Sequence, residues 1–401
     1  MSTPHTDLGE LAAASEIEGF TLLAHHDLAG SGDGFQVIRQ GKWLYVAHLG
    51  ESDMALSVLD ISDIGNPRLV RQIPHPENTR CHKVQVAGDV LIQNAELPYW
   101  AKGKPGSAGM FVYDVSDPAD PRRVGFHPSG GDGVHRLWFS EAPYAHIANY
   151  LPGGRSQSYE IVDLSDPANP RSVGSWSVPG TFEEDADPWP QHDPAEFYGV
   201  HGAIPHGDRS YVSCLDAGMA ILDIADPSAP SLLGHVSWSP PMGGFVHTAL
   251  PLAERGLVIA SSEGLPHSMQ AGDKRIWVID VREETHPVPI ATFPEPRPPA
   301  SSGATHYRDL PGTYGPHNLH ENRPGSYISD QTIFATYSNA GLRAYDIGDP
   351  FRPEEIAHFV PPAPTGRDSS LMNDLYVDED ARVYVTDRAG GGLYILQYDG
   401  R

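Results

Sequence analysis

The chain has few cysteines, few basic residues and no long hydrophobic run. Only two of its 401 residues are cysteine, Cys81 and Cys214, which is too few for the disulfide framework of a small secreted domain. Lys and Arg number 27 against 52 Asp and Glu, so the formal charge is −25. This balance disfavours nucleic acid and anionic lipid as partners. No stretch approaches the roughly 18 apolar residues of a membrane span.

A secretory leader is also missing from the first 20 residues. They contain no positively charged start, no apolar stretch and no cleavage signature. We therefore expect a cytoplasmic protein that acts on a small-molecule substrate, with neither nucleic acid nor membrane as a partner. The sequence leaves the oligomeric state open.

Helical periodicity is nearly absent, whereas turn-forming residues are abundant. No segment of helical length has a convincing 3.6-residue apolar period, apart from a short stretch near residues 8–15. The 41 Gly and 38 Pro indicate many short elements joined by turns, and the 39% of hydrophobic residues are enough for a core.

One phrase recurs along the whole chain: alternating apolar residues, an Asp, and then Asp-Pro-x-x-Pro. Clear copies are SVLDISDIGNPRLV, FVYDVSDPADPRRV, EIVDLSDPANPRSV and AILDIADPSAPSLL, and more divergent copies occupy 277–290, 343–356 and 393–400. The equivalent positions are Asp60, Asp114, Asp163, Asp223, Asp280, Asp346 and Gln397. Such a regular period indicates one supersecondary unit per copy.

Each unit reads as four strands, with the Asp-Pro-x-x-Pro turn between the third and the fourth. Seven four-stranded units predict an all-β, seven-bladed β-propeller rather than a β-solenoid. Residues 19–28 resemble the fourth strands of other units, so we expect them to complete the last blade. The prediction is a single domain over 1–401, with an extension at 1–18, the closing strand at 19–28 and blades 1 to 7 in 29–401.

The repeated phrase closely resembles that of the LVIVD-repeat proteins, which are named for a similar third strand and are taken to form propellers. The resemblance covers nearly the whole chain, and the copy at 277–290 departs most because Glu283-Glu284 replaces both residues of Asp-Pro. It implies a fold but no function, because propellers host many unrelated functions.

A histidine begins the first strand of five consecutive units, and in a propeller that strand lines the central channel. With 20 histidines in 401 residues, chance would place about a third of one among seven equivalent positions. The last unit has Asn373 at this position and the first has Phe35. The five histidines are His82, His135, His201, His247 and His317.

Two interpretations of these histidines stay open. Each could satisfy a backbone carbonyl in a duplicated repeat, or the imidazoles could converge on one transition metal. Neutral imidazole suits Fe, Mn, Cu and Zn and suits Ca or Mg poorly. We expect one such ion, with Fe(II) favoured and Mn, Zn or Cu as alternatives.

Carboxylates follow the second strands of some units, where they could fix a ligand's tautomer or transfer protons. Glu96 and Glu263 are the strongest candidates, and His135 is a candidate both as a ligand and as a catalytic proton-transfer group. HNLH at 317–320 has the wrong spacing for two ligands on one strand face, so His320 is expected outside the shell.

Three functions follow from this pattern. The first is an oxygenase-like oxidoreductase acting on a small lipophilic or aromatic substrate, because an all-imidazole shell leaves a redox metal open to O2. The second is a hydrolase, lyase or isomerase in which the metal acts as a Lewis acid. The third is a non-enzymatic propeller whose surface binds another protein.

Overall fold

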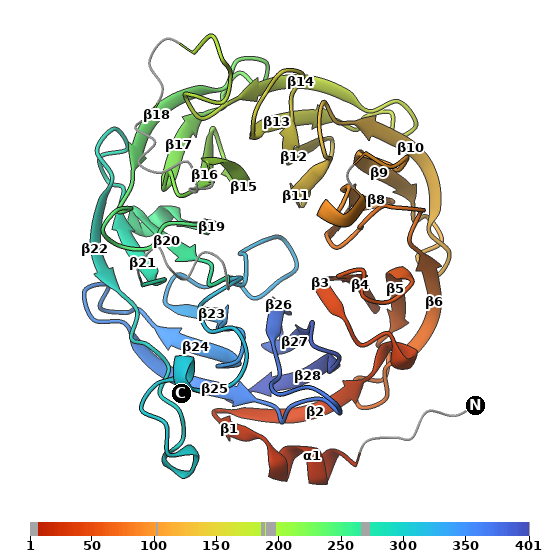
Figure 1. Ribbon diagram of the computed structural model, residues 1–401, viewed down its shortest axis with the longest axis vertical. Helices are drawn as coiled ribbons and strands as arrows, with labels where there is room; N and C mark the ends of the chain where they lie inside the picture. Colours follow the sequence, from red (N-terminus) through yellow and green to blue (C-terminus); the bar gives the residue numbers. More distant parts are fainter. Residues whose placement is uncertain (1–6, 102, 186–188, 190–197, 266–272, 401) are drawn as a thin grey trace. The chain divides into compact units, whose positions relative to one another are not determined.

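The computed structural model describes the chain except residues 1–6, 102, 186–188, 190–197, 266–272 and 401. The described residues form antiparallel sheets, most of them four-stranded, with only short helices (Figure 1). The predicted all-β class is therefore confirmed. The chain divides into two compact units. Unit 1 contains Met1–Pro74, Gly264–Pro266 and Ala291–Arg401, and unit 2 contains His75–Glu263 and His267–Ile290.

Unit 1 holds three sheets, each with four strands. The first has the order β3 (Gly34–Gln40), β4 (Trp43–His48), β5 (Met54–Asp60) and β6 (Arg68–Pro74). The second has the order β2 (Phe20–His26), β28 (Gly392–Tyr398), β27 (Arg382–Asp387) and β26 (Met372–Val377). The third has the order β1 (Glu16–Glu18), β25 (Glu354–Val360), β24 (Leu342–Asp346) and β23 (Thr332–Thr336).

The N-terminal strand β2 completes the sheet that ends the chain, as predicted for residues 19–28. It runs antiparallel to β28, and Figure 1 shows the red strand beside the blue one. The register runs from Phe20 opposite Tyr398 to His26 opposite Leu393. Pairing the two ends of the chain covers the backbone groups that β28 would otherwise expose at a sheet edge.

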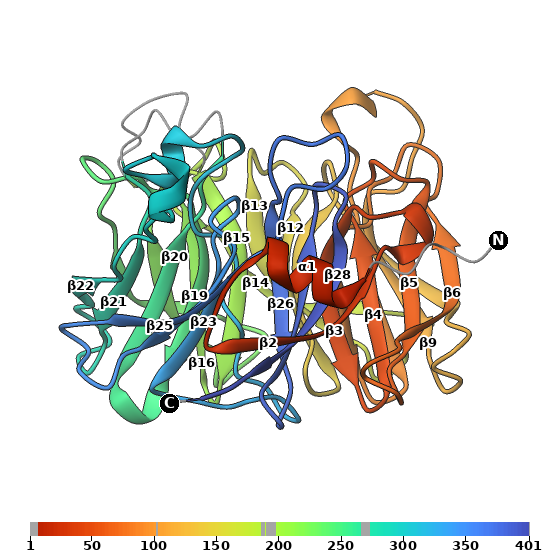
Figure 2. The same cartoon turned by 90° about the horizontal axis from the view of Figure 1, so that it is seen from below.

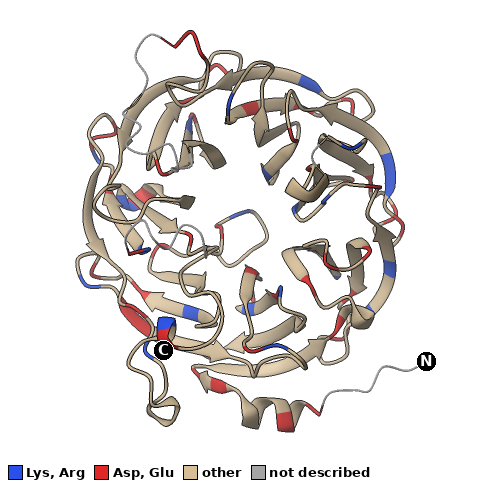
Figure 3. Cartoon of the chain, in the orientation of Figure 1, with Lys and Arg blue, Asp and Glu red and all other residues tan. Residues whose placement is uncertain are grey.

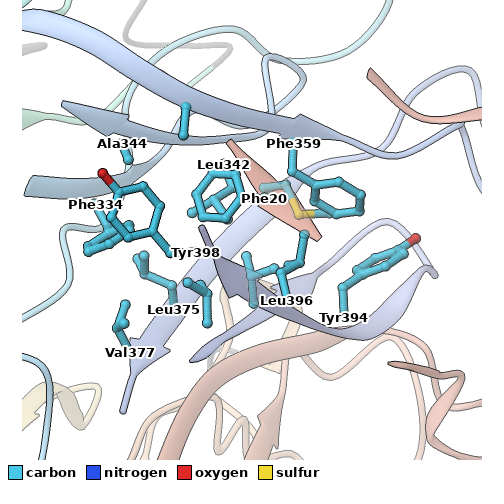
Figure 4. Packing of buried hydrophobic residues seen from close by; sticks show 14 of the residues in the cluster. Phe20, Phe334, Leu342, Ala344, Phe359, Leu375, Val377, Tyr394, Leu396 and Tyr398 are labelled. Atoms are coloured by element: carbon cyan, nitrogen blue, oxygen red, sulfur yellow. The ribbon is translucent and has the colours of Figure 1, made fainter. Parts of the chain in front are cut away.

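The segment before β2 is more ordered than the extension predicted for 1–18. Residues Leu8–Ala14 form helix α1 (Figure 2), capped by the Asp7 side chain, and β1 pairs with β25 (Figure 1). Leu11 of α1 belongs to one core cluster with Phe20 of β2, Phe334 and Tyr398. The last three are labelled in Figure 4. Part of the extension therefore belongs to the packed structure of unit 1.

Unit 2 holds the remaining strands. One sheet runs β10 (Arg122–Pro128), β9 (Gly109–Asp114), β8 (Val90–Ala95) and β7 (Val84–Ala87), and the next runs β11 (Val134–Trp138), β12 (Tyr144–Tyr150), β13 (Gln157–Asp163) and β14 (Arg171–Trp176). The others are β15 (Tyr198–His206), β16 (Arg209–Leu215), β17 (Met219–Asp223) and β18 (Ser231–Val236), then β19 (Val246–Leu252), β20 (Leu257–Ser262), β21 (Ile276–Asp280) and β22 (Val288–Thr292). A single pair, Leu215 opposite Val246, joins these two quartets into one sheet.

The repeated Asp has a structural role that explains the phrase. In three clear copies its Oδ1 accepts the backbone N–H two residues on, and its Oδ2 accepts from an Arg eight residues on, in the fourth strand. Figure 3 shows blue basic positions on the fourth strands β6, β10 and β14. The groups are Asp60 with Ser62 (2.9 Å) and Arg68 (3.1 Å), Asp114 with Ser116 (2.8 Å) and Arg122 (2.6 Å), and Asp163 with Ser165 (2.8 Å) and Arg171 (3.2 Å). The Asp thus initiates the turn and ties the fourth strand to the third.

The helices of the described residues are all short. Besides α1 there are 3-10 turns at Leu28–Gly30, Tyr99–Ala101, Ala253–Arg255, Ala300–Ser302 and Tyr307–Asp309. Within the described part of the chain, none is long and apolar enough to cross a bilayer.

Candidate metal centre

In five units, the first-strand residue that the repeat aligned lies in a β-bulge. The register of β3, β11, β15, β19 and β26 shifts at this point, so an extra residue interrupts the ladder. A bulge re-aims a side chain and frees a backbone carbonyl, and such bulges are common beside active sites. The residues in these bulges are Phe35, His135, His201, His247 and Asn373.

The two other predicted histidines lie outside named strands. His82 precedes β7 by two residues, and His317 lies in a segment that is not a named strand, although its N–H donates to the Thr336 carbonyl of β23 at 2.8 Å and Leu319 forms an isolated bridge. For these two residues the expected first strand therefore starts late or is irregular.

Four of the predicted histidines form a continuous row of rings in unit 2. Ring centroids are 5.0 Å apart for His82 and His135, 4.9 Å for His135 and His201, and 4.2 Å for His201 and His247. His82, His201 and His247 are buried, whereas the His135 side chain is 25% exposed. The row is therefore reached from solvent at His135.

Glu96 joins the first two rings. It directly follows β8, and its backbone bridges Arg80 and Gly133. Its Oε1 lies 3.1 Å from Nδ1 of His135, its Oε2 lies 3.8 Å from Nδ1 of His82, and Arg80 donates to Oε2. Burial raises the pKa of Glu96, but the charges of His135 and Arg80 outweigh it and lower that pKa to about 2. Glu96 is therefore a carboxylate at neutral pH.

Glu263 joins the other end of the row. It follows β20, is buried, and has a carboxylate oxygen within 4.8 Å of a ring nitrogen of both His201 and His247. The structure thus brings both predicted carboxylates to the histidines, Glu96 at one end and Glu263 at the other.

Hydrogen bonds fix which ring nitrogen carries the lone pair. Nδ1 of His135 faces a carboxylate, and Nδ1 of His201 lies 2.9 Å from the carbonyl oxygen of His247. Both partners only accept, so each Nδ1 carries a proton, and each Nε2 has a lone pair when its ring is neutral. In contrast, the Asn94 amide donates to Nδ1 of His82 at 3.2 Å, which leaves the proton on Nε2.

Two buried imidazoles of the row, His82 and His201, are neutral. Burial, reinforced by the charge of Arg80, lowers the pKa of His82 well below its usual value. Burial also lowers the pKa of His201, and the His135 and Arg136 charges add to the effect. Neutral rings with lone pairs are the form that binds transition metals.

His317 has the same arrangement within unit 1. Its Nδ1 lies 2.5 Å from the carbonyl oxygen of Asn373, so its Nε2 also keeps a lone pair. Nδ1 of His201 and Nδ1 of His317 therefore each bond to a backbone carbonyl freed by a bulge, as expected if the repeated histidine has a structural role. This bond leaves Nε2 of each ring available. His320 differs, because its Nε2 lies 2.9 Å from the Tyr327 carbonyl oxygen and its Nδ1 accepts from the Val377 N–H.

Arg136 is a residue of the site that the sequence analysis did not identify. It lies beside His135 in the β11 bulge, is buried, and donates from Nη1 to the carbonyl oxygen of His247 at 3.1 Å. Nη1 also lies 2.8 Å from Nδ1 and 3.4 Å from Nε2 of His247, so it contacts both ring nitrogens. A Cβ on Gly202 would come within 2.5 Å of Arg136 Cδ, so this glycine leaves the space for the arginine. The one available signal was its position next to a predicted ligand.

Comparisons with known proteins agree with the fold. The family model of the LVIVD repeat matches residues 31–73, 142–178 and 206–237. Among curated proteins, none matches the sequence. Similar solved structures are the computationally designed protein Ika8 (TM-score 0.51, 10% identity, covering 93% of this chain and 98% of that one) and the C-terminal WD40 domain of Sif2 (TM-score 0.55, 8% identity, covering 94% and 98%). At such identity the likeness shows a propeller-type fold alone.

Proposed function

We propose that this LVIVD-repeat protein is a metal-dependent oxidoreductase, oxygenase-like in its chemistry, that acts on a small lipophilic or aromatic substrate. The observation that carries the proposal is the pair of adjacent rings, His135 and His201, that both present an Nε2 lone pair. An ionised carboxylate, Glu96, holds the first ring. Carboxylate-oriented histidine is the usual outer-shell arrangement of protein metal sites.

Each residue of the proposed metal site has its own role. His135 and His201 bind a divalent ion through Nε2, and His317 fulfils the same condition in its own unit, so its membership of the site stays a prediction of the repeat alignment. Glu96 raises the basicity of His135 and fixes its ring. Neutral ligands leave the charge of the ion uncompensated, and Fe(II) bound in this way supplies the redox chemistry.

His82 and His247 would serve beside the ligands. His82 gives its Nδ1 lone pair to Asn94, and Arg136 lies against the His247 ring. A ligand that binds through Nε2 normally donates its Nδ1–H, and neither an amide NH2 group nor a guanidinium can accept it. We therefore assign both rings to substrate contact rather than to the ion.

We also propose how the blades are arranged. Three four-stranded sheets in unit 1 and four quartets in unit 2 agree with the seven blades that the repeat predicts. We propose one seven-bladed propeller in the cytoplasm, closed by β2.

A second function is favoured by one feature, the approach of Glu263 to His201 and His247. A mixed nitrogen and oxygen donor set also suits a Lewis-acidic ion such as Zn or Mn. Glu263 would then serve as the proton acceptor of a hydrolase, lyase or isomerase.

One experiment separates the two functions. Protein purified without a His-tag is stripped of metal, reloaded with Fe(II), Mn(II) or Zn(II), and assayed against a substrate panel with and without O2. The redox proposal expects turnover only with Fe(II) and O2. Full turnover with Zn(II) or Mn(II) under anaerobic conditions would establish the Lewis-acid function instead.

A further inference from the structure

A cavity of about 400 Å³ lies in unit 2 at the other ends of the strands that carry the histidines. Trp138 ends β11 and Pro205 lies near the end of β15, and both line the cavity. His135 lies three residues before Trp138, about 10 Å away along an extended strand. The cavity is therefore separate from the candidate metal centre, and its volume suits a small ligand.

A buried histidine faces this cavity. His146 lines it and is only 9% exposed, and its Nδ1 lies 2.5 Å from the hydroxyl of Tyr159, whose ring stacks on it. Among the described residues, no other group hydrogen-bonds to the imidazole, so Nε2 is available to a ligand that enters the cavity. Burial lowers the pKa of His146 to about 4, so the ring is neutral at pH 7 and attracts no anion.

The charged side chain in the lining of the cavity is acidic. Glu141 is the only carboxylate in it, and the lining contains no Lys or Arg. Within the described residues, Glu141 makes no ion pair or hydrogen bond. The aromatic rings of Trp138 and Tyr144 lie in the same lining, and a cation is stabilised over such rings.

We propose that this cavity binds a small organic amine in its protonated form. The ammonium group pairs with Glu141 and lies against the aromatic rings, and the apolar body of the amine packs on Ile224. Nε2 of His146 provides one further hydrogen bond. The formal charge of −25 favours the approach of a cation and opposes that of an anion.

Three probes of one size test the charge requirement. Benzylamine, benzyl alcohol and benzoate are titrated into the full chain at pH 7, and binding is followed by calorimetry and by ligand-observed NMR. We expect benzylamine to bind at least tenfold more tightly than benzyl alcohol, and benzoate not to bind. The same titrations with His201→Ala should give unchanged affinities, so failure of the metal proposal would not affect this result.

Two matched variants test the position. Glu141→Gln removes the carboxylate of the cavity, and Glu184→Gln makes the same change at an exposed position of unit 2. We expect benzylamine affinity to fall at least tenfold in the first and to stay within twofold in the second. Equal binding of amine and alcohol, equal affinities in both variants, or no benzylamine binding at millimolar concentration would each overturn the proposal.

Discussion

Replacing Phe20 by Ala tests whether the N-terminal strand is held by packing as well as by backbone pairing. Phe20 is 5% exposed, and its ring centroid lies 5.6 Å from that of Tyr398 and 6.4 Å from that of Phe334 (Figure 4). Buried Phe→Ala changes cost about 3–5 kcal/mol. Because β2 is an edge strand that can relax into the space, we expect about 3 kcal/mol here.

The measurement is urea unfolding followed by circular dichroism. The matched control is Thr21→Ala on the same strand, because the exposed Thr21 side chain bonds only to Asp399. We expect the control to change the free energy of unfolding by no more than about 0.5 kcal/mol. If Phe20→Ala cost no more than the control, the packing role assigned to β2 would be wrong. Deletion of residues 1–28 should go further and abolish cooperative unfolding.

Three more predictions concern buried groups. Burial, opposed by the N–H groups of Ala389 and Leu371, raises the pKa of Asp387 from 3.8 to about 6, so the stability it contributes is complete below pH 4 and is lost as the pH rises through 6. In urea titrations, Asp387→Asn should therefore have the same free energy of unfolding as the parent at pH 4. At pH 8 its free energy of unfolding should exceed that of the parent by on the order of 2 kcal/mol. A difference between the two proteins that does not change with pH would contradict the raised pKa of Asp387. Glu96→Gln removes the charge behind His135 and should weaken metal binding 10–100-fold in a chelator competition, whereas an unaltered affinity would exclude that role. Burial raises the pKa of both Cys81 and Cys214, so neither thiol should react with a disulfide reagent until urea unfolds the chain, and prompt labelling of the native protein would be incompatible with the fold.

The fold was largely predictable because the repeat leaves the same chemistry in every copy. The Asp that ends the third strand makes the same turn in all four clear copies and the same Arg contact in three of them, so the phrase specifies a local structure. The closing strand could be recognised because residues 19–28 carry a fourth-strand pattern without a preceding unit. Strand β1 could not, since three residues that pair with β25 leave no periodic signal.

The candidate site was predictable in position but not in detail. Repeat alignment identified the histidines, and second-strand ends identified Glu96 and Glu263. The hydrogen bonds that distinguish His135 and His201 from His82 depend on Asn94 and on the carbonyl of His247, which are remote in the chain. Such contacts leave no periodic pattern in the sequence, because they arise from bulges and from the packing of one sheet on the next.

The central claim is that His135 and His201 hold a metal ion through Nε2. The most direct test is the metal-to-protein ratio, measured by mass spectrometry on untagged protein after reconstitution with Fe(II). We expect about one ion per chain in the parent and in His206→Ala, whose ring is exposed at the end of β15. We expect loss of that ion in His135→Ala and His201→Ala, with the circular dichroism spectrum retained. A parent protein without metal, or the same ratio in all four proteins, would contradict the claim.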